Sequence, residues 1–254
     1  MTRIMSCRSK TLAALLTFLF AASPLVAQSP PGQVPRIVLQ KAAADFQQGN
    51  VSEAEQALRA ALKQAPRDPA ALGLLGVILD AQKRYDEAEA TYKQALATAP
   101  GSPALLNNLG NHYMAQGKTE QARATYLKVV AAEPRYPNAN LQLAHLSVAA
   151  QQGPAALKYL DHLSPEDQAS PPVAILRARA LKLNGQDKAA ENLLAQVEKN
   201  VGNDPRVSFS IGMTFVDWQR YADAENAFTR ALDAAPTNFD ILYNLGLAAQ
   251  HAGH

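Results

Sequence analysis

A period of 34 residues runs through most of this chain and constrains its fold more than any other feature. Two adjacent units, 69–102 and 103–136, match position by position, so that Leu75-Gly76 in the first corresponds to Leu109-Gly110 in the second. Units in this register begin at Pro35, Pro69, Pro103, Pro137, Pro171, Pro205 and Phe239. A fixed period of this length is typical of a solenoid, in which each unit buries its apolar face against its neighbours.

Two positions of the unit hold only small residues, which predicts a close crossing of two helices. The twentieth residue is Ala in every unit that contains it, and the eighth is always Ala or Gly. Small residues on facing helices let the axes approach to the short end of the roughly 8–10 Å range. The twenty-fourth position is bulky in each unit: Leu58, Tyr92, Tyr126, Leu160, Leu194 and Phe228. Each unit is therefore predicted to be a helical hairpin locked by one large side chain.

The unit boundaries carry the expected helix start and stop signals. Side chains that can accept from free backbone N–H groups precede five of the predicted first helices. They are Asp68, Ser102, Ser170, Asp204 and Asn238. Glycines that permit a left-handed helix end lie between paired helices at Gly49, Gly117 and Gly185. The range 151–172 departs from this pattern, and we expect a shortened or bent fourth hairpin there.

These residues resemble the tetratricopeptide repeat, in which Leu-Gly, Tyr, Gly, Ala, an aromatic residue and Pro recur at this spacing. The segment from Ala104 to Gly117, ALLNNLGNHYMAQG, is close to the family consensus. The resemblance covers Pro35 to the C-terminus. It implies an all-α, right-handed α-solenoid of about six and a half 34-residue hairpins. It does not specify a function, because the family contains adaptors of many kinds.

The first 27 residues form a separate segment. Arg3, Arg8 and Lys10 precede an apolar run from Leu12 to Ala22, and small residues follow, which is the pattern of a signal peptide. We expect a signal peptide over 1–27, a linker over 28–34 and the repeat array over 35–254. Export to the periplasm or the medium follows from this division. The alternative is an uncleaved N-terminal anchor in the inner membrane.

Charge and cysteine content exclude several classes of function. Residues 1–27 hold three of the 24 Lys and Arg and none of the 22 Asp and Glu, so the rest carries 21 against 22, a net charge of −1. A global attraction to nucleic acid or to an anionic membrane is not expected. Cys7 is the only cysteine. The exported chain would therefore have no thiol for a disulfide, a catalytic step or a metal site.

No constellation of residues predicts catalysis, a cofactor or a metal. His112 has no His or carboxylate partner at the i, i+4 spacing of metal-binding helices, and His162 has only Asp161 beside it and Glu166 beyond. Only His251 and His254 lie close together, so we expect structural or solvated histidines. No nucleophile elbow or phosphate-binding loop appears. Carboxylates such as Glu53, Glu55, Asp86, Glu87 and Glu89 cluster where second helices begin, and there a negative charge stabilises the helix dipole. The sequence therefore predicts a protein that is not an enzyme.

One stripe along the first helices is a candidate binding surface. In the resembling family this stripe lines a concave groove in which peptides dock. Its candidates are Asn107, Asn111, Met114, Asn138, Leu141, His145, Arg179, Lys182 and Arg206. Asn can pair with a peptide backbone through both its donor and its acceptor, and Arg and Lys can hold a carboxylate. The alternative is a helix face that is merely solvated.

We therefore expect a non-catalytic scaffold of the bacterial cell envelope that binds a peptide or helix of another protein. The alternative is a module that recruits substrate for a separate catalytic or secretion-channel partner, such as pilus or polysaccharide export machinery.

A helix over 239–250 would begin a seventh hairpin. Part of it should pack on Phe228 and Leu232, and its remaining apolar face should be covered by a second copy or by a partner.

Overall fold

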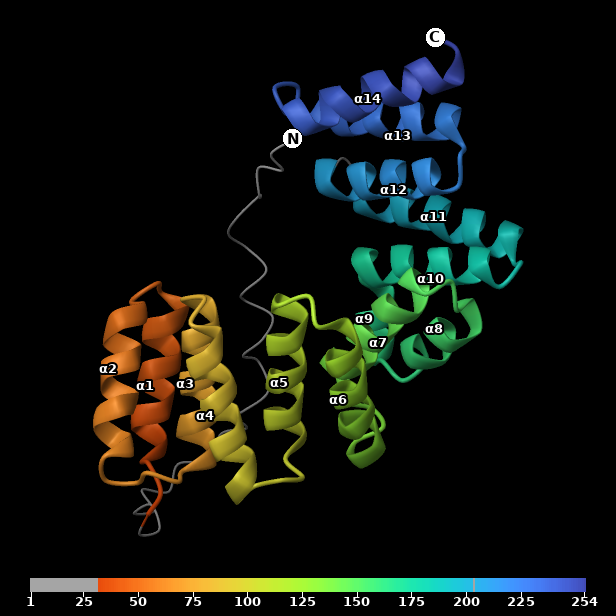
Figure 1. The fold of residues 1–254 in the computed structure, drawn as a ribbon. Helices are drawn as coiled ribbons and strands as arrows, with labels where there is room; N and C mark the ends of the chain where they lie inside the picture. The colour runs from red at the N-terminus through yellow and green to blue at the C-terminus, as the bar shows by residue number, and fades with distance from the viewer. Residues whose placement is uncertain (1–31, 203) are drawn as a thin grey trace. The chain divides into compact units, whose positions relative to one another are not determined.

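The computed structural model describes residues 32–202 and 204–254, and these form fourteen helices and no strand (Figure 1). The predicted signal peptide, 1–27, lies outside the described residues, as does most of the predicted linker. The helices group into two units, with residues up to 132 in the first and residues from 133 onward in the second.

The first unit consists of three antiparallel helical hairpins. Its helices are α1 (Arg36–Gln47), α2 (Val51–Leu62), α3 (Pro69–Ala81), α4 (Tyr85–Thr98), α5 (Pro103–Ala115) and α6 (Thr119–Ala132). The second unit continues the pattern, with one extra short helix. Its helices are α7 (Pro137–Ala149), α8 (Gly153–Leu160), α9 (Pro165–Ala169), α10 (Pro171–Leu183), α11 (Asp187–Val201), α12 (Pro205–Asp217), α13 (Tyr221–Ala234) and α14 (Phe239–Ala252). The predicted all-α repeat is confirmed, since six first helices begin at the residue that the period assigned to them.

Side-chain caps fix most of these helix starts. Asp68 accepts from the Ala71 N–H at 2.7 Å, and Asn238 accepts from the Ile241 N–H at 3.2 Å. Ser102 and Asp204 cap α5 and α12 in the same way. Ser170 does not, because its hydroxyl donates to the Asp167 carbonyl at the end of α9, 2.6 Å away. The cap predicted at Ser170 is therefore wrong.

The turns inside the hairpins use a left-handed residue, and only half of them use glycine for it. Gly49, Gly117 and Gly185 have φ of 88°, 72° and 71°, as predicted. The other three hairpins place Lys83, Gln151 and Gln219 in the same region, at φ of 63°, 58° and 58°. Residues other than glycine adopt this backbone region at a cost in free energy. The packing of the two flanking helices must therefore hold these three turns in place.

A glycine on the first helix and an aromatic ring on the second lock three of the hairpins. A Cβ added to Gly76, Gly110 or Gly212 would lie 2.5 Å from a ring carbon of Tyr92, Tyr126 or Phe228, respectively. No side chain larger than hydrogen fits without moving the ring. All three rings are almost fully buried, which confirms the close crossing predicted from the small residues.

The fourth hairpin is shortened, as predicted. Its second helix, α8, has eight residues, and the five-residue helix α9 leads into α10. Gly153 at the start of α8 is needed for a close approach, because a Cβ there would lie 2.7 Å from the Ala180 carbonyl oxygen. Leu160 is still fully buried, so the lock of the repeat survives the shortening.

Ion pairs tie the second helices of successive hairpins at equivalent repeat positions. Arg84 contacts Glu55 at 2.8 Å in the first unit, and Arg220 contacts Glu191 at 2.5 Å in the second. Burial alone would raise the pKa of Glu55, but hydrogen bonds from Gln82, Arg59 and Arg84 lower this pKa to about 2. At these positions the carboxylates connect hairpins, a contact that the helix-dipole interpretation of Glu55 did not include.

Candidate functional site

In the first unit, a histidine and its polar partners are sealed between α3, α4 and α5. The His112 ring is fully buried, and its Nδ1 lies 2.6 Å from Asp80 Oδ1. The Tyr92 hydroxyl donates to Asp80 Oδ2 at 2.9 Å, and Gln116 reaches the other ring nitrogen at 2.5 Å. Burial raises the pKa of Asp80, opposed by its hydrogen bond to His112. This cluster links three helices, and its histidine is closed off from solvent.

The candidate residues on α5 are engaged in the fold. Asn107 is buried. Asn111 accepts from the Tyr126 hydroxyl at 2.6 Å, so its carbonyl oxygen is used inside its own hairpin. Met114 is half-buried. These placements leave little of the predicted Asn surface free for a partner in the first unit.

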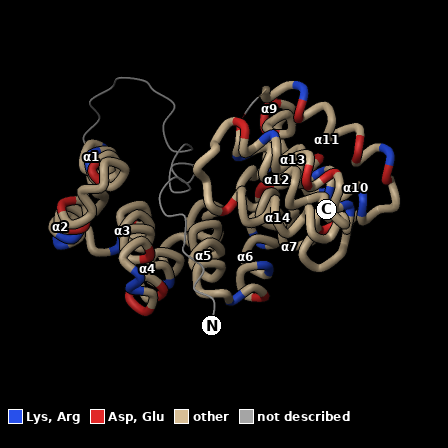
Figure 2. The backbone as a smooth tube through the Cα atoms, turned by 90° about the horizontal axis from the view of Figure 1, so that it is seen from above, with Lys and Arg blue, Asp and Glu red and all other residues tan. Residues whose placement is uncertain are grey.

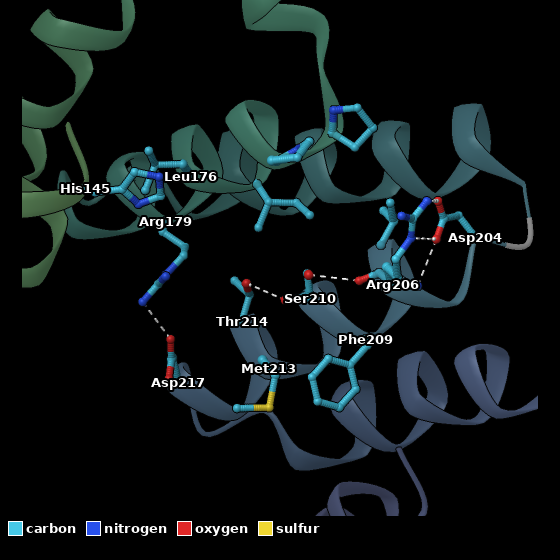
Figure 3. A pocket seen from close by; sticks show the side chains of 14 residues that line it. His145, Leu176, Arg179, Asp204, Arg206, Phe209, Ser210, Met213, Thr214 and Asp217 are labelled. Atoms are coloured by element: carbon cyan, nitrogen blue, oxygen red, sulfur yellow. Dashed lines mark hydrogen bonds and ion pairs between the residues drawn. The ribbon is translucent and has the colours of Figure 1, made fainter. Parts of the chain in front are cut away.

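The second unit carries an open groove between first helices, and several predicted residues lie on it. The groove has a volume of about 610 Å³, and its walls come from α10 and α12, with His145 contributed by α7 (Figure 3). Its apolar lining includes Pro172, Ile175, Leu176, Val207, Phe209 and Met213. Ligand grooves in proteins are mostly apolar with a few placed polar groups, and this one has that composition.

An arginine and an aspartate pair at each end of the groove. Arg179 contacts Asp217 at 2.9 Å, and Arg206 contacts Asp204 at 3.0 Å (Figure 3). The Arg206 guanidinium also lowers the pKa of Asp204 through its hydrogen bonds. Both pairs are partly or largely exposed to water, so each contributes little to stability. The two arginines therefore lie where the sequence placed them, but each already has a carboxylate beside it.

Polar groups between the two ends complete the lining. The Ser210 hydroxyl donates to the Arg206 carbonyl at 2.9 Å, and the Thr214 hydroxyl donates to the Ser210 carbonyl at 2.9 Å. The Ser210 oxygen lies on the exposed face and keeps lone pairs that can accept from a backbone N–H. Desolvation and the nearby Arg179 charge lower the pKa of His145, so the groove favours the neutral imidazole.

Three of the candidates, His145, Arg179 and Arg206, line the groove together. The others in this unit lie elsewhere. Leu141 packs partly on the core around α8 and α10. Lys182 bonds Asp187 at 2.8 Å and lies over the Trp218 ring. Asn138 is half-buried on α7 and is not part of the lining.

Several groove residues were missed by the sequence reasoning. Ser210, Met213 and Asp217 continue the stripe of His145 and Arg179 onto α12, at the same or neighbouring positions of the repeat. The 34-residue step alone would have extended the stripe to the sixth repeat, which begins at Pro205. The pairing of each arginine with an aspartate had no signal in the spacing.

The described residues contain no group of three or more His, Cys, Asp or Glu side chains placed to hold a metal ion. Within the same ranges, none of the helices combines the length and the hydropathy that a membrane span requires. Lys and Arg are interspersed with Asp and Glu along the described backbone of each unit, without a long run of one sign (Figure 2).

No curated protein matches the chain significantly, but solved structures do. A structure of PilW, a widely conserved type IV pilus biogenesis factor, superposes with a TM-score of 0.68 at 23% identity, over 82% of this chain and 97% of that one. PilF of Pseudomonas aeruginosa gives 0.64 at 19% identity, over 82% and 94%. The APC/C hetero-tetramer Cut9–Hcn1 gives 0.66 at 15% identity; 87% of this chain is covered, but it spans only 44% of that chain.

At these identities the superpositions establish the fold. The sequence profile of the tetratricopeptide repeat matches residues 39–103, 107–171 and 209–253, and a second profile of the same repeat matches 79–134. The matched segments cover more than half of the chain and agree with the hairpins and their locks. The chain belongs to the tetratricopeptide repeat family.

Proposed function

We propose that this protein is a non-catalytic scaffold that binds a segment of another protein in the groove between α10 and α12. The observation that carries the proposal is the lining of that groove, an apolar floor bounded at each end by an arginine–aspartate pair. In the first unit, by contrast, the polar residues of the candidate stripe are buried or bonded within the hairpins.

The lining also defines the chemistry of the bound segment. The floor, with Ile175, Val207 and Met213, suits one or two apolar side chains. Each end offers a cation and an anion together, so the groove has no net preference for a carboxylate. Charged groups of either sign in the bound segment can pair there after displacing one partner of the existing ion pair. We therefore propose a segment with an apolar centre and polar flanks, not an acidic tail.

Two substitutions in the groove and one outside it test this proposal. Ser210→Trp fills the groove with a large ring, and Met213→Glu places a carboxylate on its floor; both positions are exposed, so the fold should tolerate the changes. Leu127→Glu is the matched control, since Leu127 is an exposed apolar residue on α6. We expect wild type and Leu127→Glu to capture the same proteins from a cell-envelope fraction, identified by mass spectrometry.

The two groove variants should lose that set of proteins while keeping the helical circular dichroism and melting temperature of the wild type. Retention of the full set by Ser210→Trp and Met213→Glu would place the contact on another surface and refute the groove as the binding site.

We also propose that the scaffold works in the bacterial cell envelope. The support is the signal-peptide pattern of residues 1–27. A role with pilus machinery is consistent with the likeness to PilW, a type IV pilus biogenesis factor, and that likeness extends only to the fold. N-terminal sequencing of protein from the envelope fraction should find a start near Gln28. Protein recovered from the cytoplasm with Met1 intact would contradict export.

A further inference from the structure

The last helix, α14, has two apolar faces, and the described residues cover only one of them. Ile241 and Ala248 are buried at 3% and 1% exposure, and Ala248 packs with Ala224 and Phe228 of α13. The opposite face keeps four large apolar side chains in solvent. Their exposed fractions are 75% for Phe239, 45% for Leu242, 58% for Tyr243 and 37% for Leu247.

These exposed residues form a continuous seam. The seam consists of six residues at steps of three and four, which is the spacing of a helix face that packs against another helix. They are Phe239, Leu242, Tyr243, Gly246, Leu247 and Gln250. None of the six is charged at neutral pH, and the only side chains on α14 that can carry a charge near neutral pH are Asp240 and His251. Charge repulsion would therefore do little to keep two such seams apart.

Gly246 is a notch of the kind that locks the hairpins, but without a ring in it. In the equivalent glycines Gly76, Gly110 and Gly212, an added Cβ would meet an aromatic carbon at 2.5 Å. At Gly246 an added Cβ would meet no described atom within 4 Å. The same seam carries a suitable ring in Tyr243, three residues earlier and exposed.

We propose that α14 pairs with α14 of a second copy of this chain, antiparallel about a two-fold axis between residues 244 and 245. In that register Tyr243 faces Gly246 of the second copy and Leu242 faces Leu247, while Phe239 lies opposite Gln250. Every contact occurs twice, as a two-fold interface requires. The antiparallel arrangement also places the positive end of each helix dipole beside the negative end of the other.

A second copy fits the seam better than an unrelated helix, because the seam supplies both the knob and the notch. The helices of this chain that present a ring to a glycine are α4, α6 and α13, and each is already used inside its own hairpin. One helix face is smaller than the roughly 1,200 Å² at the low end of stable interfaces. The dimer should therefore be weak and depend on concentration, with a Kd in the micromolar range, about 1–100 µM.

Sedimentation of the protein expressed from the full sequence tests this proposal, over total concentrations from about 1 µM to about 300 µM. The wild type should show a reversible monomer–dimer equilibrium. Tyr243→Asp should raise the Kd at least about tenfold. Leu127→Asp, at an exposed apolar position on α6, should leave the equilibrium unchanged. Circular dichroism checks that each variant keeps its helices.

An exchange of knob and notch tests the register. Gly246→Tyr alone places two tyrosines opposite each other and should weaken the dimer. The double variant Tyr243→Ala with Gly246→Tyr restores one ring opposite one small residue and should recover most of the wild-type affinity. A wild type that stays monomeric at every concentration would overturn the proposal. Failure of the double variant to recover association would overturn the register.

Discussion

The hairpins α5–α6 and α12–α13 have the same glycine–ring contact between their two helices. They differ in the residue that follows this glycine and in whether that residue is bonded inside the hairpin. In both, a glycine on the first helix receives an aromatic ring from the second. In α5–α6 the ring is Tyr126, and its hydroxyl donates a hydrogen bond to Asn111, the residue after the glycine. In the second the ring is Phe228, which has no hydroxyl, and the residue after its glycine is Met213, exposed on the groove.

A second hairpin of the first unit, α3–α4, uses its locking ring in the same way. The Tyr92 hydroxyl also donates to a first-helix residue, Asp80, and Asp80 in turn bonds His112. The remaining locking residue of the first unit is Leu58, and those of the second unit are Leu160, Leu194 and Phe228. None of these four has a hydroxyl that could form such a bond. In two hairpins of the first unit, a hydroxyl on the locking residue therefore holds a first-helix polar group inside the fold. The groove lies in the second unit, where no locking residue has a hydroxyl.

The largest effect is expected from removing the lock itself. Tyr126→Ala and Phe228→Ala each leave a buried ring-sized cavity and should lower the free energy of unfolding by about 3–5 kcal/mol. Tyr126→Ala should cost more, because Asn111 also loses its partner. Chemical denaturation followed by circular dichroism measures both. Gly246→Ala is the control of opposite sign, since Ala replaces Gly in an open helix position and should stabilise by about 1 kcal/mol at low protein concentration.

His112→Ala comes next and contrasts a buried histidine with an exposed one. It leaves Asp80 with only Tyr92 as a partner in a largely buried place, and we expect a loss of about 3 kcal/mol. The control is His145→Ala on the groove, where the change should stay within about 0.5 kcal/mol. Equal losses in the two variants would show that the first-unit cluster is not a structural element.

Glu55 predicts a dependence of stability on pH. Its pKa is about 2 in the folded protein, below the ordinary value of 4.5. The unfolded chain therefore binds more protons between these values, and stability present above pH 4.5 is lost as the pH falls toward 2. Between pH 7 and pH 3, wild type should lose about 1–2 kcal/mol more than Glu55→Gln, since the contacts of Glu55 are partly solvated. Parallel pH profiles of the two proteins would contradict this.

The smallest stability effect isolates the hydroxyl. Tyr126→Phe keeps the ring but leaves the Asn111 carbonyl without its donor, and should cost about 0.5–1.5 kcal/mol.

The tyrosine–asparagine pair can also be introduced into α12–α13. Phe228→Tyr should destabilise the second unit, and adding Met213→Asn should recover part of the loss. A double variant no better than Phe228→Tyr alone would show that the hydroxyl pairing is not portable between hairpins.

The fold was predictable because its signals are local and repeated. Alanine at the twentieth position, a small eighth residue and a bulky twenty-fourth residue recur in register, and they produced the observed hairpins. Ser170 was mispredicted because a preceding helix, α9, offered its hydroxyl a carbonyl instead. The left-handed turns at Lys83 and Gln219 had no glycine to mark them.

The site was only partly predictable, because side-chain pairing depends on contacts between repeats. The spacing within its own helix showed no partner for His112, and it could not show that Asp80 lies against the ring from the preceding hairpin. Arg179 and Arg206 were placed on a stripe that does line the groove, but their aspartate partners come from the far end of α12 and from its cap. Asn107 and Asn111 share the stripe of the groove residues and differ only in what covers them.

A photocrosslinking comparison tests the central claim most directly. A benzophenone amino acid is introduced at Met213, on the groove, and in a second protein at Val77, which holds the same repeat position in the first unit. Both proteins are irradiated with a cell-envelope fraction. We predict that position 213 forms adducts with a partner protein and that position 77 forms none above background. Adducts from position 77 with none from position 213 would contradict the claim that the second unit carries the binding surface.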